Sequence, residues 1–231
     1  MPERNRDAVR EEEVESRWEA APAVALVIGF QLVLAFVSRA YDWRLWGLPW
    51  WVWLISVGPE AALLAALALN RSRRRLEQLG KRRMVALALL GLVSLTNGLL
   101  LVALLGSLIS GHERSGGQLL LKATTIWGTN VIAFGLWYWG FDRGGPVRRR
   151  QANPPPPDFQ FPQMENPQLA APGWYPHLVD YVYVSFTNAI AFSPTDAMPL
   201  SRWAKLLMLT ESGISGITVL LVAARAVNIF K

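Results

Sequence analysis

Cysteine is absent from this sequence of 231 residues, and histidines and charged side chains are scarce. Without cysteine the chain cannot form disulfides, zinc–thiolate sites, iron–sulfur clusters or a cysteine nucleophile. The two histidines, His112 and His177, are too few for a histidine-rich metal site, and neither stands at a ligand spacing. No nucleotide-binding or hydrolase motif occurs, so the sequence predicts a protein that is not an enzyme and that has no metal site and no cofactor.

Charged residues make up only 17% of the chain, against about 25% in an average soluble domain, whereas 52% of the residues are hydrophobic. The apolar residues are gathered in long runs, which a soluble core of this size could not bury. A run of about 20 apolar residues matches the thickness of a bilayer, where a helix satisfies its own backbone. Five runs therefore predict transmembrane helices over 21–38, 47–69, 84–110, 118–141 and 203–230.

Basic residues predict the orientation of these helices. The loop 70–83 holds seven Lys and Arg residues and one acid, which is typical of a cytoplasmic loop. The N-terminal segment 1–20 is then cytoplasmic as well, in a multi-pass protein of the cell membrane. The basic clusters lie at helix ends and lack interleaved aromatic residues, so we expect the lipid bilayer and not nucleic acid as the partner. Aromatic clusters over 43–53 and 137–139 are interpreted as interfacial belts.

Residues 142–177 have no apolar period and contain the polyproline run Pro154–Pro157, which predicts a surface linker. The apolar run that follows, 178–192, is short for a membrane span and has the length of a re-entrant half-helix. The predicted fold is therefore an all-α integral membrane protein with four transmembrane helices, a re-entrant half-helix and a final transmembrane helix. If the run over 178–192 crosses the bilayer completely, the chain has six spans instead.

The most specific motif lies over residues 185–199, which read S-F-T-N-A-I-A-F-S-P-T-D-A-M-P. Without a gap, this string resembles the pattern S-F-T-T-L-T-T-V-G-Y-G-D-x-x-P of two-helix potassium channels. Its continuation through Arg202, Lys205 and Glu211 is also similar. The resemblance implies that 118–231 is a pore-domain-like unit, with an outer helix 118–141, a pore helix 178–192, a filter-like loop 193–199 and an inner helix 203–230. The whole chain also resembles a family of uncharacterised bacterial integral membrane proteins.

The filter positions themselves depart from the channel pattern. The positions that correspond to T-V-G-Y-G hold Ala191, Phe192, Ser193, Pro194 and Thr195. Potassium filters aim rings of backbone carbonyls inward, which requires glycine, whereas Pro194 fixes φ and has no such freedom. The sequence therefore predicts an ion channel-like protein that is weakly selective or non-conducting. The hydroxyls of Thr187, Ser193 and Thr195 are candidates for lining a constriction, and Asp196 retains the aspartate of the motif.

The resemblance implies a homo-oligomer, a tetramer if the analogy holds, that passes small cations. In the channel family the linker before the pore helix is extracellular, whereas the basic residues of this chain place 142–177 in the cytoplasm. An inverted pore, an exception to the charge rule, or a sixth span would each reconcile the two predictions.

Two other functions compete with a channel. Glu60, Asn97 and Asn130 are predicted to lie near one depth in the membrane. A carboxylate there is costly, so Glu60 favours a proton- or ion-coupled transporter, although interhelical hydrogen bonding would also use such residues. In the last run, Gly213 and Gly216 predict either close helix packing or a gate hinge. A structural or accessory membrane protein is the third alternative.

Overall fold

The computed structural model describes a helical chain. The described residues are 2–69, 72, 76, 79–111, 115–146, 148–151, 153–193 and 196–229, with side chains described outside 2–19 and 225–229. Pro194 and Thr195 of the predicted filter-like loop, and most of the basic loop 70–83, lie outside these residues. Within the described residues, five helical segments are long and apolar enough to cross a membrane: Ala20–Ala40, Trp50–Ala68, Arg82–Ile109, Gly116–Gly144 and Arg202–Ala224. The prediction of an all-α multi-pass membrane protein is confirmed in this coarse form.

The chain divides into two compact units. Unit 1 comprises Met1–Pro22 and Phe134–Gly213, and unit 2 comprises Ala23–Ala133 and Ile214–Lys231. Three helices contribute residues to both units, namely α1 (Pro2–Ala40), α5 (Gly116–Phe141) and α8 (Arg202–Ile229).

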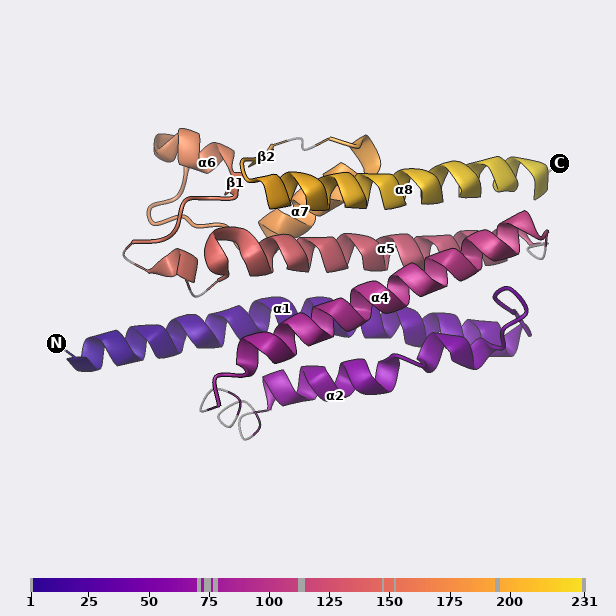
Figure 1. The fold of residues 1–231 in the computed structure, drawn as a ribbon, viewed down its shortest axis with the longest axis horizontal. Helices are drawn as coiled ribbons and strands as arrows, with labels where there is room; N and C mark the ends of the chain where they lie inside the picture. Colours follow the sequence, from indigo (N-terminus) through magenta and orange to yellow (C-terminus); the bar gives the residue numbers. More distant parts are fainter. Residues whose placement is uncertain are drawn as a thin grey trace. The chain divides into compact units, whose positions relative to one another are not determined.

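Unit 2 has an aliphatic core. Its helices are parts of α1, α5 and α8 together with α2 (Val57–Ala68) and α4 (Arg82–Ile109), and α2 lies beside α4 (Figure 1). Fully buried core side chains include Leu34, Trp53, Leu104, Leu119 and Ile126. Trp53 therefore contributes to the core, in contrast to the interfacial position that the sequence predicted for the cluster 43–53.

The second predicted transmembrane helix, 47–69, is divided in the structure. A 3-10 turn, η1 (Trp50–Leu54), precedes α2, and the first α-helical hydrogen bond runs from the Glu60 backbone N–H to the Ser56 carbonyl at 2.8 Å. Pro59 lies in the first turn of α2, where a missing N–H removes no helical hydrogen bond. The proline therefore helps to begin the helix at Val57 and does not interrupt a longer one.

Unit 1 contains the end of α5, the residues predicted as a linker, a short helix and the beginning of α8. The linker region includes η2 (Asp142–Gly144), η3 (Arg148–Arg150), β1 (Phe159–Gln160), α6 (Pro162–Glu165) and η4 (Pro167–Leu169). Helix α7 (Leu178–Ala191) follows, and β2 (Met198–Pro199) leads into α8. The two strands pair antiparallel, Phe159 opposite Pro199 and Gln160 opposite Met198.

Phe159 is the centre of an aromatic cluster that ties these segments together. Its ring is fully buried, and its centroid lies 5.0 Å from that of Tyr138, 6.1 Å from that of Tyr181 and 5.9 Å from that of Trp203. These partners stand near the end of α5, the beginning of α7 and the beginning of α8. Helices α7 and α8 thus begin at the same place, and the chain returns there after α7 (Figure 1).

Candidate functional site

A buried carboxylate, that of Glu211, joins α5, α7 and α8 in unit 1. Its Oε2 accepts hydrogen bonds from the Tyr138 hydroxyl at 2.6 Å and from Asn188 Nδ2 at 2.7 Å, and its Oε1 accepts one from the Ser185 hydroxyl. Glu211, Tyr138 and Ser185 are fully buried, and Asn188 nearly so. Both carboxylate oxygens therefore have donors, as a polar group away from water requires. We call Tyr138, Ser185, Asn188 and Glu211 the Glu211 cluster.

Further contacts fix α7 against its neighbours around this cluster. The Ser212 hydroxyl donates to Asn188 Oδ1 at 3.0 Å, and Asn188 Nδ2 also donates to the Met208 carbonyl at 3.0 Å. On α5, a Cβ added at Gly135 would stand 2.8 Å from Val182 Cγ2 and 2.9 Å from Val182 Cα. Glycine at this position therefore allows the α5 and α7 backbones to approach closely. These contacts hold α7 in one position relative to α5 and α8.

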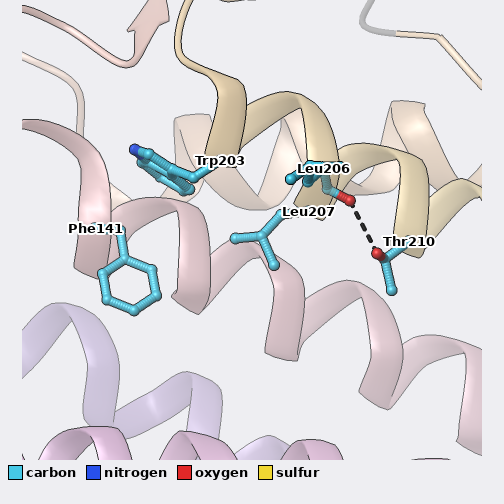
Figure 2. A pocket seen from close by; sticks show the side chains of 5 residues that line it. All are labelled: Phe141, Trp203, Leu206, Leu207 and Thr210. Atoms are coloured by element: carbon cyan, nitrogen blue, oxygen red, sulfur yellow. Dashed lines mark hydrogen bonds between the residues drawn. The ribbon is translucent and has the colours of Figure 1, made fainter.

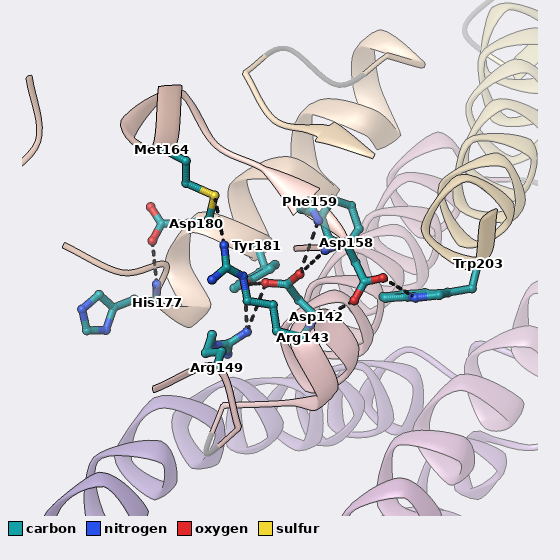
Figure 3. Close-up of polar contacts among 10 residues, drawn as sticks. All are labelled: Asp142, Arg143, Arg149, Asp158, Phe159, Met164, His177, Asp180, Tyr181 and Trp203. Carbon is teal, nitrogen blue, oxygen red and sulfur yellow. Dashed lines mark hydrogen bonds and ion pairs between the residues drawn. The ribbon is translucent and has the colours of Figure 1, made fainter. Parts of the chain in front are cut away.

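A second buried carboxylate, that of Asp142, holds the first turn of α7 to the end of α5 (Figure 3). Asp142 Oδ1 accepts from the backbone N–H groups of Asp158 at 2.8 Å and Phe159 at 3.3 Å. Asp142 Oδ2 accepts from the Tyr181 hydroxyl at 2.5 Å and lies 3.7 Å from Arg149 Nη1. Tyr181 is fully buried, and its hydroxyl also accepts a hydrogen bond from Arg149 Nη1 at 2.8 Å.

Asp158 extends this arrangement to α8. Its Oδ2 accepts from the Arg143 backbone N–H at 2.9 Å, and its Oδ1 accepts from Trp203 Nε1 at 2.8 Å (Figure 3). The Leu200 backbone N–H donates to the Asp158 carbonyl at 2.8 Å. Asp158 and Phe159 therefore hold the end of α5 close to the beginnings of α7 and α8.

The opposite face of α7 is apolar and exposed. The inward residues Tyr181, Ser185 and Asn188 are all buried. The outward residues follow the same helical spacing, with exposed fractions between 44% and 70%: Val179, Tyr183, Phe186 and Ile190. A helix with polar groups inside and apolar groups outside is typical of an apolar environment or of a protein interface.

The predicted filter-like residues lie at and after the end of α7. Ala191, Phe192, Ser193 and Asp196 are exposed, and Phe192 has φ 53° in the left-handed region. The Thr187 hydroxyl bonds to the carbonyls of Tyr183 at 3.0 Å and Val184 at 3.1 Å, one turn earlier in its own helix. In this structure the Thr187 hydroxyl is therefore satisfied within α7.

The predicted intramembrane polar residues are all buried, but they have different partners. Glu60 Oε1 accepts from Gln31 Nε2 at 3.3 Å, whereas Asn130 Nδ2 donates to the Ser215 hydroxyl at 3.4 Å. Asn97 is buried on α4, and among the residues that the structure describes no hydrogen bond joins it to either of the others.

The two glycines singled out in the last run differ from each other. Gly213 is exposed, and a Cβ built there meets no described atom within 4 Å, whereas Gly216 is half-buried. Helix α8 continues through both positions, so the helix is unbroken at the predicted hinge.

Sequence reasoning missed the central roles of Glu211 and Tyr138. Glu211 entered only through the channel resemblance, although an acid within an apolar run is the signal that singled out Glu60. Tyr138 was assigned to an interfacial belt with its neighbours, whereas its ring is fully buried and its hydroxyl binds Glu211. A buried tyrosine needs a hydrogen-bond partner, and the acid in α8 was available in the sequence.

An apolar pocket of about 540 Å³ lies between α5 and α8 (Figure 2). Phe141, Trp203, Leu206, Leu207 and Thr210 line it. The Thr210 hydroxyl donates to the Leu206 carbonyl at 2.9 Å and is thus engaged in its own helix. The pocket therefore presents hydrocarbon and suits an apolar group better than an ion.

Comparison with known proteins adds no relative: no family model, no curated protein and no solved structure matches this chain.

Proposed function

We propose that unit 1 is a pore-loop unit, in which α7 is a re-entrant half-helix, and that copies of the chain assemble into a homo-oligomer that passes small cations with weak selectivity. The main support is that α7 and α8 begin at the same aromatic cluster. Helix α7 has 14 residues and is about 21 Å long, which is less than the hydrocarbon thickness of about 30 Å. The residues between Ala191 and Met198 are just enough to return over such a distance, at about 3.4 Å each.

The end of α7 is the part of this unit suited to a pore. Backbone that is not paired in a helix cannot face lipid, so it lies against protein or lines a water-filled cavity. Phe192, Ser193 and Asp196 are exposed in the single chain, so a cover must come from water or from other subunits. In a closed symmetric oligomer the same segment of each subunit meets around the axis. The exposed apolar face of α7 offers the surface for that assembly.

Weak selectivity follows from the residues at the filter positions. Selective carbonyl rings need a backbone that alternates freely, and none of the five positions from Ala191 to Thr195 is glycine. Phe192 adopts a left-handed conformation as the residue that ends α7, and a proline at position 194 restricts the choice of φ further. We therefore expect potassium and sodium to pass at similar rates.

We further propose that α7 enters from the cytoplasmic side of the inner membrane, with the N-terminus on that side. This orientation rests on the seven basic residues of the loop 70–83. Arg149 is not counted with them, because it is buried against Asp142 and Tyr181 and has a structural role. The chain has no cysteine, so single cysteines can be introduced at Ser72, Gln168 and Leu200 and labelled with an impermeant thiol reagent. We expect all three to be protected in intact cells. Labelling of Gln168 and Leu200 from opposite sides would show that α7 crosses completely.

Conduction is tested with purified protein reconstituted in lipid vesicles, by comparing potassium and sodium efflux and by measuring the oligomeric state in detergent. Asp196→Asn removes the exposed acid after α7 and is expected to reduce cation flux. Asp42→Asn makes the same chemical change at an exposed position of unit 2 and is expected to leave flux unchanged. A monomer without flux, or a strongly potassium-selective oligomer, would contradict the proposal.

A further inference from the structure

A buried carboxylate in unit 2 lacks the partners that Glu211 has in unit 1. Glu60 is fully buried, its Oε1 accepts a hydrogen bond from Gln31 Nε2 at 3.3 Å, and its Oε2 has no hydrogen-bond partner in the described part of the chain. From this geometry we propose that Glu60 is a proton-binding site, with Gln31 and Ser56 as the residues that position it. The site does not depend on the pore function proposed for unit 1.

Two neighbouring polar residues organise the site. The Ser56 hydroxyl donates to Gln31 Oε1 at 3.3 Å, which turns the amide so that Nε2 faces Glu60. Ser56 also stands immediately before α2, and its carbonyl accepts the Glu60 backbone N–H at 2.8 Å. Gln31 and Ser56 are both almost fully buried. The three residues thus form a connected chain that leaves only Glu60 Oε2 without a partner.

The charges on the packed elements do not neutralise Glu60. On α1, the Arg39 guanidinium lies over the Trp50 ring, 5.2 Å from its centroid, and on α5, Lys122 Nζ donates to the Arg44 carbonyl at 2.5 Å. The charged residues of α4 in unit 2, Arg82 and Arg83, stand in its first turn. No ion pair to Glu60 occurs among the described residues. An ionised carboxylate with one oxygen unpartnered is costly away from water, so the neutral acid is favoured.

A proton fits this site better than a metal ion does. Hard cations take six or more oxygen ligands, whereas only Glu60 offers an unengaged carboxylate oxygen here and Gln31 Oε1 already accepts from Ser56. No group of three His, Asp or Glu side chains within the described residues could hold a metal. A proton from water binds Glu60 as an O–H group and returns to water on release. Release leaves a buried charge, so it requires water to enter between α1 and α2.

The proposal is tested by labelling with dicyclohexylcarbodiimide, a lipid-soluble reagent that modifies protonated carboxyl groups in apolar surroundings. The wild-type protein in vesicles is treated, digested and analysed by peptide mass spectrometry, with a water-soluble carbodiimide as the matched reagent. We expect the lipid-soluble reagent to modify Glu60 and the water-soluble one to leave it intact. An unmodified Glu60, or equal modification by both reagents, would overturn the proposal. The wild type alone decides this outcome, so it does not depend on the folding of a variant.

The positioning role of Gln31 has a separate readout. Gln31→Leu removes the amide that donates to the ionised carboxylate and keeps a similar volume, so the neutral form of Glu60 is favoured further. At a pH high enough for wild-type Glu60 to be mostly ionised, we expect the labelling rate of Glu60 to increase about fivefold, the change that the loss of one hydrogen bond produces. Gln31→Asn keeps an amide, so its labelling rate of Glu60 should lie between those of the wild type and Gln31→Leu. An unchanged rate in Gln31→Leu would exclude Gln31 from the site.

Discussion

The hydrogen bond between Tyr138 and Glu211 can be isolated by a double-mutant cycle, because the two residues lie on different helices and one atom pair joins them. Tyr138→Phe removes the hydroxyl that donates to Glu211 Oε2 at 2.6 Å and leaves the ring in its aromatic contacts. Hydrogen bonds to charged groups contribute about 1.5 to 3 kcal/mol, whereas interhelical bonds in membranes average about 0.6 kcal/mol. Asn188 still donates to the same oxygen, so we expect Tyr138→Phe to lower the free energy of unfolding by about 1.5 kcal/mol.

The second arm of the cycle is Glu211→Leu. It leaves the Tyr138 hydroxyl buried without an acceptor, which costs about 1 to 3 kcal/mol beyond the lost packing. In that background the hydroxyl contributes nothing favourable, and Tyr138→Phe should be neutral or stabilising. The expected coupling energy between the two positions is therefore about 1.5 kcal/mol or more.

The assay is equilibrium unfolding in mixed micelles, followed by tryptophan fluorescence for all four proteins of the cycle. Tyr183→Phe is the matched control, because Tyr183 lies on the exposed face of α7. It should change the free energy of unfolding by less than about 0.5 kcal/mol, both in the wild type and in Glu211→Leu. Additive effects of Tyr138→Phe and Glu211→Leu would refute the conclusion that the Glu211 cluster holds α5, α7 and α8 together.

Two further substitutions test the placement of α7. Gly135→Ala should lower the free energy of unfolding by about 1 to 3 kcal/mol, because the added Cβ meets the Val182 backbone. In the control Gly128→Ala the added Cβ meets the Phe30 ring at 3.3 Å, and this variant should be neutral in thermal unfolding. Phe192→Gly should raise the free energy of unfolding in denaturant by about 1 kcal/mol, because glycine adopts φ 53° without strain; a loss of stability would show that the Phe192 side chain contributes packing there.

The sequence by itself determined the class of protein, because span length and hydropathy are local properties of a run of residues. The five apolar runs appear as five helices able to cross a membrane, and the short run after the linker appears as the 14-residue α7. Glycine, proline and charge placement likewise act within a few residues. This is why the boundaries of most helices could be predicted within a few positions, whereas the break between η1 and α2 was not predicted.

The tertiary structure alone decided which polar groups meet. Tyr138 and Glu211 are 73 positions apart, and Ser185 and Glu211 are 26 apart, so no periodicity in the chain connects them. The same holds for Phe159 of the predicted linker, whose ring brings together α5, α7 and α8. Glu60 and Glu211 look alike in the sequence, as single acids in apolar runs. They differ because folding brings side-chain donors to both carboxylate oxygens of Glu211, whereas Glu60 Oε2 has no partner in the described part of the chain.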